Sequence, residues 1–240
     1  MDSASSAVKT AYSSSTSADQ IARELGEAFA DASPGVIMFF CAHTLDGTRV
    51  SAELRARFPA AQVLGCTSAG EYTDAIYGRG GTAAMAIPSH KVGGCAATLA
   101  RFGGGVAEGV RKACDELSTQ LGTSLRELDP KRYVGIVLIE GSKGNEEAVN
   151  EELGNVAPFL SFVGGSAGDD IAFKRTELFH AGGSSDDGAA LLVMEMKTPF
   201  AVVKTCNYEP TDTSFTITRL GEHPRVILEL DGRPARTVYA

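Results

Sequence analysis

The sequence contains no tryptophan, and its 240 residues include only four histidines and five cysteines. No pair of cysteines has the Cys-x-x-Cys spacing, which excludes a zinc knuckle or a dithiol redox site of that kind. The histidines show no ligand spacing either, so we expect no metal site. An odd number of scattered cysteines is typical of a reduced protein, and we expect a cytoplasmic location.

Long apolar runs and basic clusters are missing as well. No apolar stretch approaches the roughly 18 residues that a membrane helix needs, so we expect no membrane insertion. Residues 1–19 lack a charged region followed by an apolar one, and we expect no secretory signal. The net charge is −8 and the 22 basic residues are scattered, which argues against nucleic acid as a partner.

Buried-type strands and amphipathic helices alternate along the chain. Continuous apolar runs at 36–41 and 133–141 are typical of strands that are buried on both faces. Ser17, Asp46 and Asn145 each precede an amphipathic stretch and are candidate helix caps. This alternation predicts an α/β fold with largely parallel central strands flanked by helices.

Further β-like segments predict antiparallel strands that are added to this core. Segments 81–89 and 91–102 have the pattern of a hairpin. Three more runs, at 176–183, 188–197 and 200–208, also favour strands.

One short motif occurs twice, as VLGCTSAGEY at 63–72 and as FVGGSAGDD at 162–170. The shift of 99 positions that brings Gly65 onto Gly164 also relates apolar positions of the predicted strands and helices. These pairs are Ile37 and Ile136, Val50 and Val149, and Leu54 and Leu153. The agreement predicts an internal duplication with two pseudo-symmetric lobes, at about 8–102 and 103–210.

Each copy of the motif runs from an apolar strand through a small-residue turn into a carboxylate. Ligands of α/β sheets bind beyond the carboxyl ends of the strands, where small residues expose backbone N–H groups. Hydroxyls and N–H groups suit a carboxylate, and Glu71 and Asp169 suit an ammonium group. The motifs therefore predict a crevice between the lobes for a small polar ligand such as an amino acid. The candidate ligand-binding residues are Gly65, Cys66, Thr67, Ser68, Gly70, Glu71, Ser142, Gly164, Gly165, Ser166, Gly168 and Asp169.

Ser142 belongs to this set because the loop GSKGNEE, at 141–147, combines a lysine with a predicted helix start and forms a plausible anion pocket. The alternative for both motifs is that they build tight turns, with carboxylates that are solvated or cap nearby N–H groups. Cys66 is either an activated thiol or an inert small residue.

The segment GGSAG, at 164–168, also fits G-x-S-x-G, the nucleophile elbow of serine hydrolases. That elbow needs a helix directly after Ser166, whereas the following DDIAFKRTELFH has no helical apolar stripe. The Gly-rich segment at 103–109 departs from G-x-G-x-x-G, so we expect no nucleotide or other cofactor. A serine hydrolase that uses Ser166 and a ligand-free interaction scaffold are the alternative functions.

The two motifs, joined by YVGIVLIEGSKGNEE at 133–147, resemble the FIST family of intracellular sensory domains. The resemblance covers about 8–205, and we assign 1–210 to the family's N-terminal domain. The tail RVILELDGRPARTVYA resembles the start of the family's C-terminal domain, to which we assign 211–240. Because a predicted helix begins at Pro234, we expect the full protein to continue beyond this chain.

The resemblance implies a signal-transduction module that binds small molecules, for which amino acids have been proposed. It implies no catalytic residues, and it leaves the signalling output partner open. Cys66 departs from the paired motif, which has glycine there. We therefore expect a sensory domain that is not an enzyme and that binds its ligand between two lobes.

Overall fold

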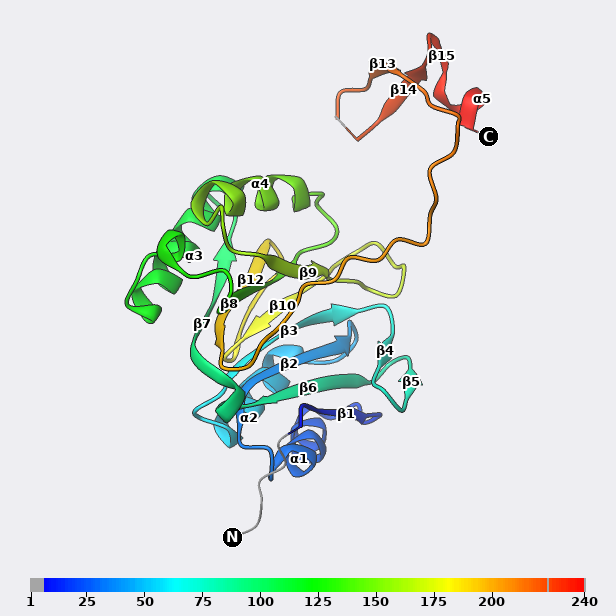
Figure 1. Cartoon of the computed structure of the whole chain (residues 1–240). Coiled ribbons are helices and arrows are strands. Elements are labelled where there is room, and N and C mark those ends of the chain that lie inside the picture. The colour runs from blue at the N-terminus through cyan, green and yellow to red at the C-terminus, as the bar shows by residue number, and fades with distance from the viewer. Residues whose placement is uncertain (1–6, 224, 240) are drawn as a thin grey trace. The chain divides into compact units, whose positions relative to one another are not determined.

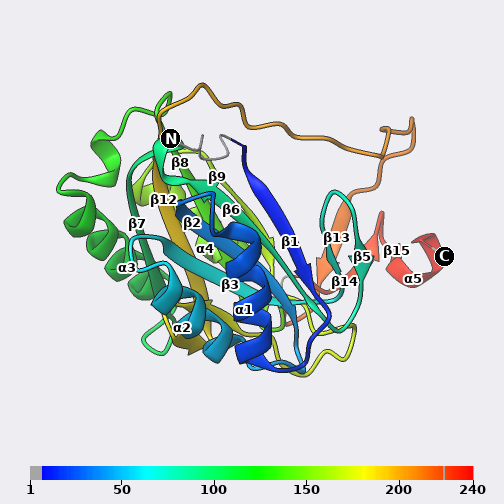
Figure 2. The same ribbon diagram turned by 90° about the horizontal axis from the view of Figure 1, so that it is seen from below.

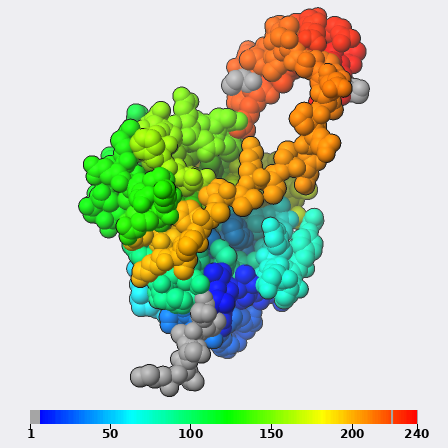
Figure 3. All heavy atoms as spheres, viewed as in Figure 1, coloured from blue at the N-terminus to red at the C-terminus, as the bar shows by residue number. Residues whose placement is uncertain are grey.

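The structure is a computed structural model, and it describes residues 7–223 and 225–239. The chain divides into two units, of which the first ends at Val202 and the second begins at Val203. In the first unit two β-sheets pack against each other, and helices cover the outer face of each sheet (Figure 1). The space-filling view shows the first half of this unit, in blue to cyan, against its second half, in green (Figure 3).

The first sheet has six strands in the order β1-β6-β2-β3-β10-β11. These are β1 (Lys9–Ser13), β6 (Thr82–Pro88), β2 (Pro34–Ala42), β3 (Gln62–Ser68), β10 (Leu178–His180) and β11 (Gly183–Ser185). The second sheet has four strands in the order β7-β12-β8-β9. These are β7 (Val92–Arg101), β12 (Gly188–Met196), β8 (Tyr133–Ile139) and β9 (Phe162–Ser166).

Each sheet contains one parallel pair, β2 with β3 and β8 with β9. The remaining pairs of both sheets, among the residues that the structure describes, are antiparallel. A two-stranded hairpin of β4 (Glu71–Tyr72) and β5 (Tyr77–Gly78) follows β3. The predicted α/β class, with parallel pairs, flanking helices and added antiparallel strands, is confirmed.

The alternation of side chains in β2 explains why its sequence is a continuous apolar run. Ile37 and Phe39 pack with the helices on the outer face, whereas Val36 and Met38 pack between the two sheets. Because both faces of the strand are buried, no position in its middle favours a polar side chain.

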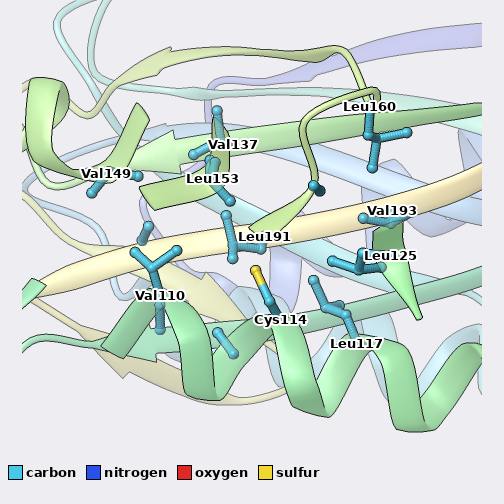
Figure 4. Close-up of a cluster of buried hydrophobic side chains, with 14 of the residues drawn as sticks. Val110, Cys114, Leu117, Leu125, Val137, Val149, Leu153, Leu160, Leu191 and Val193 are labelled. Carbon is cyan, nitrogen blue, oxygen red and sulfur yellow. The ribbon is translucent and has the colours of Figure 1, made fainter. Parts of the chain in front are cut away.

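Within residues 7–202, four helices form the outer layers of the first unit. They are α1 (Ala18–Phe29) and α2 (Gly47–Arg57) on the first sheet, and α3 (Val106–Leu121) and α4 (Glu146–Val156) on the second. Figure 2 shows α1 and α2 lying across the strands of the first sheet. On the second sheet, Val110, Cys114 and Leu117 of α3 point toward β12, and Cys114 lies opposite Leu191 of that strand (Figure 4). A fully buried side chain such as Leu117 contributes about 1.5–3 kcal/mol through removal from water.

The three predicted caps all occupy N-cap positions. The Asp46 carboxylate accepts a hydrogen bond of 2.9 Å from the Arg49 N–H, as the sequence pattern predicts. Ser17 and Asn145 precede α1 and α4, but their side chains make no capping hydrogen bond.

Four strands of the first sheet have the same topology as the four strands of the second. The order β1-β6-β2-β3 in the first corresponds, strand for strand along the chain, to β7-β12-β8-β9 in the second. Val50 and Val149, which the shift of 99 relates, are both fully buried under their helices. Ile37 and Ile136, however, lie on opposite faces of their strands, because a displacement of one residue reverses the face. The pairing of Ile37 with Ile136 is therefore wrong, and the internal duplication itself stays a prediction.

Two sequence-based expectations about strands are wrong. Segments 81–89 and 91–102 do contain β6 and β7, but these lie in different sheets and form no hairpin. The short 3₁₀ helix at Ser89–Lys91 connects β6 in the first sheet to β7 in the second. The two apolar strands are therefore buried in different sheets. Residues 200–208 form no strand, since no neighbouring strand pairs with them.

The described residues of the second unit form three short strands and one short helix. They are β13 (Ile217–Leu220), β14 (Ile227–Leu230), β15 (Arg233–Pro234) and α5 (Ala235–Tyr239). Asp231 and Gly232 have positive φ angles of 51° and 74° and form the turn after β14. The helix start that the sequence predicts at Pro234 is confirmed, since α5 begins at Ala235.

Candidate functional site

The turns that end β3 and β9 touch each other. The N–H of Gly168 donates a hydrogen bond of 2.9 Å to the carbonyl oxygen of Thr67. Thr67 is buried, and its N–H donates to the carbonyl of Glu177 at 2.9 Å while its Oγ1 accepts from the Glu177 N–H at 3.0 Å. In Figure 1 the arrows of β3 and β9 point toward the same end of the first unit. The fold thus brings the two sequence motifs together at one place.

A cavity of about 470 Å³ lies between the two parallel pairs, next to this contact. Its walls are mostly apolar side chains and backbone, and its polar side chains are hydroxyls. The lining residues are Met38, Phe40, Cys66, Thr67, Ser68, Ala69, Ile136, Leu138, Val163, Gly164, Gly165, Ser166 and Gly168. Seven of the twelve predicted site residues belong to this set, and no charged side chain does. We call this volume the inter-sheet cavity.

The glycines of the two motifs have different structural roles. A Cβ at Gly65 would lie 2.3 Å from the carbonyl oxygen of Phe39, and one at Gly164 would lie 1.6 Å from that of Val137. Both glycines therefore permit close strand pairing. At Gly165 a Cβ would meet no atom within 4 Å, so this position faces open space beside the inter-sheet cavity.

Glu71 is buried and serves the hairpin in which it lies. Its carboxylate accepts hydrogen bonds from the Ser68 hydroxyl at 2.7 Å and from the Gly81 N–H at 3.2 Å. Burial, and secondarily the charge of Glu71, raises the pKa of Tyr12. Glu71 does not line the inter-sheet cavity.

Asp169 organises the loop that follows β9. Its carboxylate accepts N–H hydrogen bonds from Phe173 at 2.9 Å, Lys174 at 2.6 Å and Arg175 at 3.1 Å. These bonds, with that from Lys174 the strongest influence, hold the pKa of Asp169 below its ordinary value. Asp170, Ile171 and Phe173 have positive φ angles in the same loop, a conformation that these three hydrogen bonds stabilise. The arrangement of both motif carboxylates matches the capping of nearby N–H groups.

A smaller polar pocket of about 270 Å³ adjoins the inter-sheet cavity and shares Ser68 and Ala69 with it. It carries the charged groups that the cavity lacks. Its lining residues are Ala42, His43, Thr44, Ser68, Ala69, Glu71, Arg79, Gly80 and Asp170. The Arg79 guanidinium lies 3.4 Å from the Asp170 carboxylate, so this ion pair connects the β4–β5 hairpin to the loop after Asp169.

A third volume, of about 470 Å³, lies on the face of the first sheet and includes Thr10, Phe40, Tyr72 and Met85. Gly70 lines it, as do Ser68 and Glu71. Ser68 therefore lies where all three volumes meet.

Ser142 lies apart from the inter-sheet cavity, and its backbone and hydroxyl both bind the carboxylate of Glu140. Glu140 is fully buried at the end of β8, and it also accepts from the Lys143 N–H at 3.1 Å and the Thr176 hydroxyl at 3.0 Å. Glu140 is not among the residues that the sequence motifs predict. A carboxylate that directly follows the apolar run 133–139 is the signal that marks it, because such a group needs internal donors.

The structure places Ser166 against a carboxylate and buries Cys66. The Ser166 hydroxyl donates to the Glu146 carboxylate at 2.9 Å, and residues 167–177 form a loop where an elbow needs a helix. Nδ1 of His180 lies 2.9 Å from the carbonyl oxygen of Val63. Burial raises the pKa of Cys66 to about 12, which keeps the thiol protonated.

No three His, Cys, Asp or Glu side chains gather as potential metal ligands within residues 7–223 and 225–239. Across the same residues, every helix is too short or too polar to cross a bilayer.

This chain is similar to known proteins. An uncharacterised protein of Methanocaldococcus jannaschii is 27% identical over 130 residues, which are 54% of this chain and 25% of that protein. The chain thus matches about a quarter of the relative's length. The family model described as the FIST N domain matches residues 35–233, which include both motif turns and the inter-sheet cavity. The chain therefore belongs to the FIST family of signal-transduction sensory domains.

Proposed function

We propose that this chain senses a small molecule that binds in the inter-sheet cavity. The observation that carries the proposal is the position of the cavity, at the contact between Thr67 and Gly168 where the two motif turns meet. Ligand sites of α/β proteins lie beyond the carboxyl ends of parallel strands, and both parallel pairs end here.

The lining favours a ligand with an apolar body and a polar end. Phe40, Ile136 and Leu138 offer an apolar surface in the inter-sheet cavity, whereas Arg79 and Asp170 offer charges in the adjoining polar pocket. An amino acid with an apolar side chain would place that side chain in the cavity and its charged groups past Ser68. This geometry supports the amino-acid ligand that the sequence motifs predict.

Signalling requires that the ligand binds two conformations with different affinity. The Gly168–Thr67 hydrogen bond and the Arg79–Asp170 ion pair both connect elements that border the ligand volumes. We propose that occupancy changes the arrangement of the β4–β5 hairpin and the loop after Asp169, which an output partner then reads.

We propose further that the chain is not an enzyme and that it acts in the cytoplasm. The Glu146 partner of the Ser166 hydroxyl and the loop that follows Ser166 support the first statement, and five free cysteines support the second. Hydrolysis of p-nitrophenyl esters that the Ser166→Ala variant loses would contradict the non-enzymatic assignment.

The test is a thermal-shift screen with the standard amino acids and a panel of small metabolites. A ligand at about 100 times its Kd stabilises the folded state by about 2.7 kcal/mol, which is a shift of several degrees. Gly165→Leu fills open space beside the cavity without a backbone clash, so we expect it to fold and to lose the shift. Gly154→Leu makes the same change on the exposed face of α4, where a Cβ also meets no atom, and should keep the shift.

Glu71 and Asp169 are poor choices for this test, because their carboxylates hold the turns in which they lie. The proposal fails if no compound stabilises the parent protein, or if Gly165→Leu responds as Gly154→Leu does.

A further inference from the structure

β9 lies at one end of the second sheet, and no strand of the described residues pairs with its outer edge. On the inner edge, the Ser161 carbonyl accepts from the Gly135 N–H at 2.9 Å and the Ala167 N–H donates to Ile139 at 2.8 Å. Since parallel strands bond through alternate residues, positions 163 and 165 face β8 as well. Phe162, Gly164 and Ser166 therefore turn their backbone N–H and C=O groups away from the sheet.

The corresponding edge of the first sheet is occupied. β3 holds the same place after β2 that β9 holds after β8, and its outer edge pairs with β10 in antiparallel register. Leu178 lies opposite Cys66 and His180 lies opposite Leu64. This fold thus already adds a strand at the equivalent position of its other half.

The open edge of β9 also borders the inter-sheet cavity. Val163, Gly164, Gly165 and Ser166 line the cavity, and the last three are exposed. Two successive glycines leave no side chain between an incoming backbone and this volume, and glycine in a strand often marks such an approach. Successive side chains of an added strand alternate in direction, so every second one would point toward the cavity side.

We propose that β9 binds a short extended peptide by antiparallel strand addition. The peptide backbone bonds to Phe162, Gly164 and Ser166, and one of its apolar side chains enters the inter-sheet cavity. Backbone hydrogen bonds supply affinity in this mode of recognition, and the pocket beside the strand supplies side-chain selectivity. The inference rests on the proposed sensory function and assigns peptides, in place of free amino acids, as the ligand class.

The test uses the full chain and a phage-displayed library of random heptapeptides, with counter-selection on Gly165→Leu. Selected peptides are synthesised, and their Kd is measured by isothermal titration. Ser166→Pro removes an N–H that points away from β8, a position where edge strands tolerate proline. Ser166→Ala, the matched control, removes the hydroxyl and keeps that N–H. We expect Ser166→Pro to bind the selected peptides at least tenfold more weakly than Ser166→Ala does.

Hydrogen exchange of the parent protein gives a readout that does not depend on the variants. Bound peptide should slow exchange at the amides of Gly164 and Ser166, while the Gly165 amide, which already faces β8, changes little.

The other possible outcomes show which part of the proposal is wrong. Failure to enrich peptides, or equal binding by both Ser166 variants, overturns strand addition. If small molecules raise the melting temperature of the parent protein but not that of Gly165→Leu, the sensory proposal stands without the peptide. Peptide-independent self-association that Ser166→Pro abolishes would instead identify a second copy of the chain as the occupant, and would overturn the peptide assignment.

Discussion

The amide of Gly168 donates a hydrogen bond to the carbonyl oxygen of Thr67 over 2.9 Å, and this bond joins the turn after β9 to the end of β3. The contact is close because Gly168 has no side chain. A Cβ there would lie 3.1 Å from the amide nitrogen of Ala69 and 3.3 Å from its Cβ. The two halves of the first unit therefore meet at a point where one added methyl group would crowd the neighbouring chain.

Gly168→Ala tests how tightly the two turns are held together. Because the added methyl crowds Ala69, we expect a loss of about 1 kcal/mol in the free energy of unfolding and a melting temperature lower by about 2–4 °C. Gly165→Ala is the control, since its Cβ meets open space, and it should be neutral or stabilise by up to about 1 kcal/mol. Equal melting temperatures for the two variants in a calorimetric scan would show that the turns separate freely.

Asp169 makes the stability of the first unit depend on pH in the acid range. Its pKa in the folded protein is lower than the ordinary value of 3.8, because three loop N–H groups bind the charged form. The carboxylate therefore stabilises the fold fully above about pH 4, and this contribution is lost as the pH falls through the folded-state pKa.

We expect Asp169→Asn to lower the melting temperature at pH 7 and to speed amide exchange at Phe173, Lys174 and Arg175. The gap in melting temperature between parent and variant should shrink as the pH falls below about 4. A gap that stays constant with pH would mean that the charge of Asp169 does not hold the loop.

Glu140 is the internal acceptor on which the loop after β8 depends. Glu140→Ala leaves donors of Ser142, Lys143 and Thr176 without their acceptor, so we expect a loss of about 3 kcal/mol in urea unfolding. Glu140→Gln keeps one oxygen and should lose less. Glu151→Ala, on the exposed face of α4, is the control and should change stability by no more than about 0.5 kcal/mol. If Glu140→Ala unfolds at the same urea concentration as Glu151→Ala, the carboxylate of Glu140 does not have this role.

The cysteines should differ widely in reactivity. Burial raises the pKa of Cys66 and Cys114 to about 12 each, so both thiols stay protonated at pH 8 and react slowly. Cys206 is exposed, and we expect it to supply the fast phase with Ellman's reagent in the native protein. Denaturant should release all five thiols, and Cys206→Ser should remove the fast phase. Fast native labelling of Cys66 would contradict its burial.

The sequence by itself determined many of the helices and strands of the first unit, and it predicted that the two motifs lie close together. Apolar runs such as 36–41 identify strands buried on both faces, and the stripe with Val50 and Leu54 identifies a helix, because period and composition are local properties. Small residues at strand ends predict turns that expose backbone, and on this ground the sequence indicates Thr67, Ser68 and Gly168. All three line the inter-sheet cavity, and their role in ligand binding stays a prediction.

The tertiary structure alone decided which strands share a sheet and which side chains face the cavity. β6 and β7 look like a hairpin in sequence, yet they belong to different sheets, because apolar patterns do not specify the partner of a strand. Glu71 and Asp169 were predicted to face a ligand, whereas their oxygens bind N–H and hydroxyl groups of their own turns. A carboxylate at a strand end satisfies the nearest donors, and the three-dimensional path of the chain decides which donors those are.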